Sequence, residues 1–262
     1  MGLTGQVRRL RRRRLRHAVA TLAAGVLVTG CAQVSADPAA RTGTSSPPPP
    51  VSAPPTAAVA QDAPVVTAVP PPSAAERAGL RSDEVVDRGT GGTVVVPGSA
   101  PAPTAGRERR VRVEVEGGLD VDGQAFADFV LETLNDPRGW PSDGWTFSRT
   151  DGQADVVVVL ASPQTSAAMC RPLQTFGKLS CRQGPRAILT MYRWVHGTDE
   201  YAHDLTAYRQ YLVNHEVGHV LGHGHVTCPA PGELAPVMQQ QSKQVAPCVP
   251  NAWVEPDAEA AP

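Results

Sequence analysis

The sequence predicts an α+β fold, in which a mixed, twisted sheet combines with an amphipathic helix and a second helix that carries histidines. Three observations predict it. Valine alternates with charged residues over 111–115, which is the two-residue period of a strand. Apolar residues recur at helical spacing from Phe126 to Leu134. The segment 154–160 is almost wholly apolar, which is typical of a strand buried on both faces.

The first helix is expected over about 123–135, because Asp136-Pro137 and Gly139 follow it and disfavour its continuation. The remaining elements are recognised by apolar runs between polar or glycine-containing segments. They are strands at 146–150 and 187–195, a long loop at 163–184, a helix at about 205–221 and a short additional strand among the valines at 94–96.

An export signal is expected over residues 1–30. This segment holds seven arginines and no acid, followed by an apolar stretch, 18–28, that is too short to span a bilayer comfortably. The stretch ends in Val28-Thr29-Gly30-Cys31, which resembles a bacterial lipobox. We therefore expect Cys31 to carry a lipid that anchors the protein to the cell membrane. Ordinary cleavage after Val34-Ser35-Ala36 is the alternative.

The rest of the chain divides into two parts. Residues 31–107 are rich in proline, alanine, serine and threonine and contain no aromatic residue, so they predict a disordered tether. Residues 108–262 are numerous enough to form one domain with its own core. A tether on a lipidated cysteine would let this domain reach into the cell wall, so the expected location is extracellular.

The charge of the exported part argues against a nucleic-acid partner. Removing the seven arginines of residues 1–30 from the 24 basic residues leaves 17 against 25 acidic residues, a net charge of −8. An acidic surface repels phosphate backbones.

Five cysteines are present, so four remain to pair in an oxidising compartment if Cys31 carries the lipid. Proximity in the sequence favours Cys170–Cys181 and Cys228–Cys248, although the sequence alone permits three pairings.

The motif His215-Glu216-x-x-His219-x-x-Gly222-x-x-His225 predicts a metal site. Two histidines four residues apart share one face of a helix, and a glycine in the left-handed conformation can turn the chain so that His225 becomes the third ligand. His223 also follows the glycine and is the alternative third ligand. Three protein ligands leave a position open for water, as in catalytic Zn²⁺ sites, and Glu216 is placed to accept a proton from that water.

At these residues the chain resembles the metzincin zinc endopeptidases, whose long zinc motif is followed by a Met-turn; Met238 is the candidate here. Residues from about 109 to 253 resemble a group of secreted metzincin-like domains from high-GC bacteria. The segments that carry this likeness are 111–119, 134–140 and 208–216. The resemblance implies a metzincin-like α+β fold with a small C-terminal subdomain, zinc on His215, His219 and His225, and Glu216 as general base.

The chain departs from the family pattern after the Met-turn. Several metzincins have a tyrosine there that stabilises the oxyanion, whereas Gln239, Gln240 and Gln241 follow Met238 in this sequence.

The expected function is hydrolysis of peptide bonds in a peptide or protein substrate, which would pair with a sheet edge near 187–195. Two alternatives remain open at this point: a zinc hydrolase of peptidoglycan cross-links, and a non-catalytic surface lipoprotein with a structural or idle zinc site.

Overall fold

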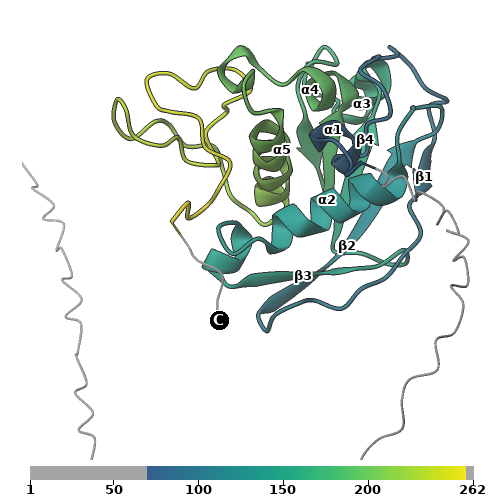
Figure 1. Ribbon diagram of the computed structural model, residues 1–262, viewed down its shortest axis with the longest axis horizontal. Coiled ribbons are helices and arrows are strands. Elements are labelled where there is room, and N and C mark those ends of the chain that lie inside the picture. Colours follow the sequence, from purple (N-terminus) through teal and green to yellow (C-terminus); the bar gives the residue numbers. More distant parts are fainter. Residues whose placement is uncertain (1–69, 258–262) are drawn as a thin grey trace, which may run out of the picture. The chain divides into compact units, whose positions relative to one another are not determined.

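The computed structural model describes residues 70–257 (Figure 1). The predicted signal at 1–30, the lipidation site Cys31 and the tether as far as residue 69 lie outside these described residues. Within the described part of the chain, no helix is both long and apolar enough to cross a membrane.

Six strands form one mostly parallel sheet, so the α+β class is confirmed. The strand order is β1-β2-β4-β6-β5, with β3 pairing along β2; β1 and β5 are the antiparallel members. The strands are β1 (Thr93–Val95), β2 (Arg107–Glu116), β3 (Trp145–Arg149), β4 (Val156–Ala161), β5 (Cys181–Gln183) and β6 (Arg186–Thr190). All six residues of β4 are buried, as its apolar sequence predicted.

Two long helices cover one face of the sheet, and a short helix with a disulfide covers the other. Valines 156 and 158 of β4 belong to the same core as α2 and α5, whereas Val157 and Val159 pack with Cys170 and Cys181. The helices are α1 (Ala74–Arg77), α2 (Gly123–Asn135), α3 (Pro163–Met169), α4 (Met191–His196) and α5 (Leu205–Val220), with 3₁₀ turns at Trp140–Asp143 and Asp199–Tyr201. The predictions for α2 and α5 are confirmed.

The folded region begins earlier than the predicted boundary at residue 108. Ser73 caps α1 in a reciprocal capping box with Glu76, and both Ala78 and Leu80 are buried in the main core. The indole N–H of Trp194 donates to the carbonyl of Ala78 at 3.0 Å. Composition was misleading here because a few small apolar residues suffice when the core they join is supplied by the rest of the domain.

Two buried carboxylates on β2 accept hydrogen bonds from this N-terminal segment. Glu114 accepts from the hydroxyl of Thr93 at 2.8 Å, and Glu116 accepts from the backbone N–H of Gly91 at 2.9 Å and of Ser162 at 2.7 Å. Both glutamates are almost fully buried. The charged side of the alternating strand is therefore not solvated, and its carboxylates satisfy hydrogen-bond donors of neighbouring segments.

The segment 163–195 differs from expectation in two places. The predicted loop at 163–184 contains α3, which Ser162 caps and Pro163 begins, and the short strand β5. The predicted strand at 187–195 ends at Thr190 and continues as α4. Met191, Trp194 and Val195 are buried at helical spacing, and a short apolar run does not by itself distinguish that pattern from a strand.

Both favoured disulfides are present. Cys170–Cys181 joins the end of α3 to β5, and Cys228–Cys248 closes a loop of the C-terminal segment. Disulfides persist in oxidising compartments, so they indicate an extracellular or secreted protein.

Truncation of Leu80 tests whether the N-terminal segment belongs to the domain. Leu80 is 4% exposed, and we expect Leu80→Ala to lower the free energy of unfolding by about 2–5 kcal/mol, measured by urea denaturation of the full chain. Val94→Ala is the matched control, because Val94 is 64% exposed and its truncation should cost less than about 0.5 kcal/mol. Equal effects of the two substitutions would show that the segment does not contribute to the core.

Candidate metal centre

Helix α5 holds the first half of the histidine motif and is buried along most of its length. Asp204 caps its N-terminus by accepting from the N–H of Ala207 at 2.9 Å. The helix lies between the sheet and the C-terminal segment, which Figure 1 draws in yellow beside it. Because it has neighbours on several sides, residues 211–218 are buried without interruption.

Gly222 ends α5 as predicted. Its φ is +102°, in the region that favours glycine. The N–H of His223 donates to the carbonyl of Gly218 at 2.9 Å, and the N–H of Gly222 donates to that of His219 at 3.2 Å. These two bonds define a Schellman motif, which reverses the chain so that His225 returns toward the helix.

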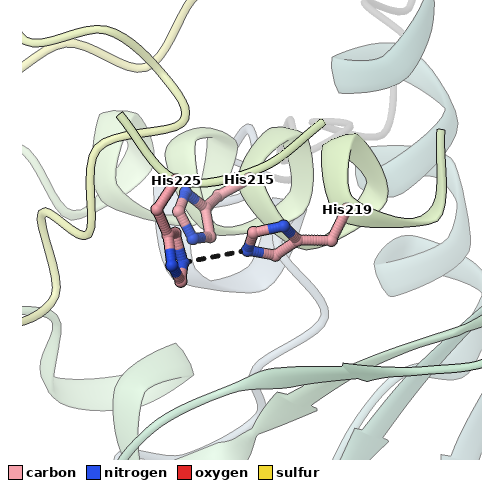
Figure 2. Close-up of side chains that lie close together, drawn as sticks. All are labelled: His215, His219 and His225. Atoms are coloured by element: carbon pink, nitrogen blue, oxygen red, sulfur yellow. Dashed lines mark hydrogen bonds between the residues drawn. The ribbon is translucent and has the colours of Figure 1, made fainter. Parts of the chain in front are cut away.

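The three predicted ligands converge on one point (Figure 2). Ligand nitrogens of His215, His219 and His225 all lie within 4.8 Å of one another, and Nε2 of His219 is 3.0 Å from Nε2 of His225. Nitrogens bound tetrahedrally to one zinc ion at about 2.0 Å lie about 3.3 Å apart. The distance between His219 and His225 is therefore close to that of a metal site, and His215 lies near enough to complete it.

Backbone carbonyls fix the tautomers of two of these rings. Nδ1 of His215 lies 2.8 Å from the carbonyl oxygen of Val237, and Nδ1 of His219 lies 2.8 Å from that of His223. A carbonyl only accepts, so each Nδ1 carries the proton, and in a neutral ring Nε2 then has a free lone pair. Carbonyl bonds of this kind orient histidine ligands in metalloproteins.

All three rings favour the neutral form that binds metal. Burial lowers the pKa of His215 from 6.5 to about 3, and burial is also the main cause that lowers the pKa values of His219 and His225. Exposure increases along the motif, from buried His215 to exposed His225. The triad can therefore hold a metal ion with one side open to solvent.

His223, the alternative third ligand, does not join the cluster. Its ring packs on Trp140, with the ring centroids 4.6 Å apart, and its contribution to the site is the carbonyl that orients His219.

Carbonyl groups of the candidate Met-turn form hydrogen bonds that position two of the predicted ligands. The carbonyl of Val237 holds His215, and the carbonyl of Met238 accepts from the N–H of Val226, the residue after His225, at 3.2 Å. A Cβ atom at Gly218 would lie 2.5 Å from the sulfur of Met238 and 2.5 Å from the ring of Trp140. Glycine at position 218 thus lets the helix approach the turn closely.

Glu216 lies beside the triad and has a buried carboxylate. The residue is 4% exposed, it lines the same pocket as His215 and His225, and its Oε2 has no hydrogen-bond partner among the described residues. Burial raises its pKa from 4.5 to about 8. A buried oxygen without a partner is costly and indicates a role toward a ligand.

The three glutamines after Met238 have different roles. Gln241 is fully buried and accepts from the hydroxyl of Tyr201 at 2.6 Å, and Gln239 donates to the carbonyl of Val245 at 2.9 Å. Both support the C-terminal segment. Gln240 lines the pocket at the triad and is the one of the three whose side chain is available there.

The sheet edge at the site is β5, which corrects the expectation for 187–195. Strand β6 is paired on both sides, by β4 and by β5, whereas β5 is paired on one side only. Ser180, Cys181 and Arg182 line the pocket that also contains His215 and His219. The missed signal is Gly184-Pro185, a two-residue turn with φ of +57° at Gly184 that joins β5 to β6 as a hairpin.

Substituting Gly222 tests whether the helix end positions the third ligand. Alanine at φ +102° is strained by about 1 kcal/mol or more, and we expect Gly222→Ala to weaken zinc binding severalfold as the chain relaxes and His225 moves. Gly224→Ala is the control, since Gly224 has no positive φ and no atom near the added Cβ. Competition with a chromophoric chelator at fixed pH measures both affinities; equal values would refute the role of Gly222.

The pKa shifts predict a stability maximum for the metal-free chain. As the pH falls below about 6.5, the unfolded chain protonates histidines that stay neutral when folded, so the lowered pKa values of the triad cost stability. The raised pKa of Glu216 acts in the opposite direction. Its stabilising effect on the folded state is fully present below about pH 4.5 and is lost as the pH rises toward about 8. We expect maximal urea resistance near pH 6.5 in EDTA. Glu216→Gln should remove the loss above that pH, and an unchanged alkaline slope would contradict the assignment.

No curated protein and no solved structure matches the chain. A family model with the description "Protein of unknown function (DUF3152)" matches residues 81–257, which include the whole histidine motif and Met238. This match covers more than half of the chain, so the protein belongs to the DUF3152 family.

Proposed function

We propose that this protein is a secreted, zinc-dependent endopeptidase. The observation that carries the proposal is the position of Glu216, a buried carboxylate with a free oxygen beside three converging histidine nitrogens. Three nitrogen ligands suit zinc, and an open fourth side is typical of catalytic rather than structural zinc sites. Among the described residues, no fourth histidine, cysteine or carboxylate completes the cluster.

We also propose that the fold is metzincin-like. Three features support this: the motif with its glycine turn, the methionine turn beneath the first ligand, and the order of strand, helix, strands and active-site helix. The C-terminal segment after Val220, which has no regular helix or strand in the described residues, corresponds to the small subdomain that the resemblance implies.

A bound zinc ion would polarise the scissile carbonyl and lower the pKa of its water toward about 7. His215, His219 and His225 would hold it through Nε2, with two of the rings oriented by the carbonyls of Val237 and His223. Glu216, which lines the pocket at the triad, would accept the proton of the attacking water with its carboxylate and deliver it to the leaving amine. Gln240 is the side chain best situated to donate to the oxyanion where metzincins use a tyrosine.

The substrate would bind as an added strand along β5. Its backbone can pair with the unpaired edge of that strand, which passes the triad at Ser180–Arg182. The disulfide Cys170–Cys181 fixes the start of this edge, so the strand is held in place before the substrate arrives.

We further propose that the lipid at Cys31 anchors the protein to the outer side of the cell membrane. The two disulfides support an extracellular location, and they account for the four cysteines of the described residues, so that Cys31 is not needed to pair with any of them.

Two substitutions separate catalysis from metal binding. Glu216→Gln should lower kcat on peptide substrates by at least about 100-fold while keeping one zinc per chain, because the general base is lost and the ligands remain. His219→Ala should lose both zinc and turnover. Elemental analysis and cleavage of a mixed peptide library by the full exported chain measure the two quantities.

Glu233→Gln serves as the control, because Glu233 is exposed and lines neither pocket at the triad. Zinc in the wild type without cleavage of any peptide would refute the peptidase proposal. Absence of zinc from the wild type would refute the metal site itself.

A further inference from the structure

A pocket of about 320 Å³ opens directly beside the triad. His215 and Glu216 form one side of it. Leu173 and Leu179, from the loop that the Cys170–Cys181 disulfide closes, form another, and Ser242 and Lys243 close the third side. The pocket thus lies between the edge-strand loop and the segment after the Met-turn, where a side chain next to the scissile bond would enter.

The charged side chains around this pocket are mainly basic. Among the described residues that line it or the adjoining pocket at the triad, Glu216 is the one carboxylate, whereas Lys243 and Arg182 supply cations. No carboxylate oxygen of the described residues lies within 4.0 Å of the charged groups of Lys243 or Arg182. The exported chain is acidic overall, so a cleft with unpaired cations is a local feature and not a reflection of composition.

Lys243 is held at the pocket by its own turn. Its N–H donates to the carbonyl of Gln240 at 2.9 Å, and its Nζ donates to Oε1 of Gln240 at 3.2 Å. A neutral amide oxygen leaves the positive charge uncompensated. Two of the three donors of the ammonium group remain available to an anion.

We infer that this pocket binds a carboxylate of the substrate, carried by a residue that flanks the scissile bond, and that Lys243 selects it. The inference rests on the proposed peptidase function and narrows it to acidic substrates. The apolar wall of Leu173 and Leu179 accommodates the methylene groups of a glutamate, and the ammonium group of Lys243 binds its carboxylate. Arg182, at the adjoining pocket, would raise the local concentration of such anionic peptides.

The carboxylate has two possible sources, a glutamate side chain within a peptide or the free C-terminus of a short peptide. Fluorogenic peptides with Glu or Gln at either residue flanking the scissile bond test the first source. Peptides that end one residue after that bond, with a free or an amidated C-terminus, test the second.

We expect the full exported chain to cleave one such pair with a kcat/KM about tenfold higher for the carboxylate than for the amide. Lys243→Met should bring this ratio close to one, and Lys243→Glu should reverse it in favour of a lysine-containing peptide. Lys178→Met is the matched control. Lys178 belongs to the loop that the Cys170–Cys181 disulfide closes, its Nζ lies 5.5 Å from the ring centre of Tyr192, and it does not line the pocket.

Binding gives a second readout that does not require turnover. Zinc-loaded Glu216→Gln protein should bind the carboxylate peptide about tenfold more tightly than its amide counterpart by calorimetry, and the double variant with Lys243→Met should not. Cleavage of both peptides of each pair at equal rates would overturn the inference and leave the peptidase proposal intact, and equal binding of the two peptides would likewise overturn the inference. Discrimination in binding without any cleavage would support the inference and refute the peptidase proposal. A preference for the carboxylate peptide that persists in the Lys243→Met variant would also overturn the inference.

Discussion

The close contact between α5 and the turn at Val237-Met238 is the constraint on which the candidate metal centre depends. One carbonyl of this turn orients His215, and the next carbonyl accepts from the N–H of Val226, so two adjacent residues fix both the helix and the segment that returns from Gly222. The contact is possible because position 218 has no side chain to collide with Met238 and Trp140. The turn itself lies in a segment without regular secondary structure. Buried amides such as Gln241 and Asn251 therefore replace the hydrogen bonds that a helix or sheet would provide.

The site brings together ionisable groups whose burial destabilises the folded state. Three imidazole nitrogens lie within 4.8 Å of one another, and a carboxylate with a free oxygen is buried next to them. Burial favours the uncharged form of each group. This suits imidazoles that could hold a metal and raises the proton affinity of the Glu216 carboxylate, but it costs stability in the metal-free chain. The compensation comes from the surrounding scaffold, where β4 and the helices bury a continuous apolar core. The disulfides restrain the two segments that border the cleft.

Among the described residues, two unpaired cations from different parts of the sequence lie beside the triad. The edge strand β5 and the segment after the Met-turn approach the triad from different parts of the sequence, and each brings a cation without an acidic partner. In a chain that is acidic outside residues 1–30, this arrangement would favour the anionic peptides proposed above, and it requires no residue beyond those that already form the walls.

The sequence by itself determined the α+β class, helices α2 and α5 and the histidine cluster, because periodicity and fixed spacing are local properties of the chain. It favoured the two disulfide pairs among three possible pairings, and the structure selected them. Only the tertiary structure decided that residues 73–107 belong to the fold, that the chain turns from strand to helix at Thr190, and that β5 and not β6 is the edge at the site. It also decided that Val237, Gln240 and Lys243 surround the triad. These features depend on which distant segments pack together, and a short apolar or polar stretch has no preference of its own until its neighbours supply one.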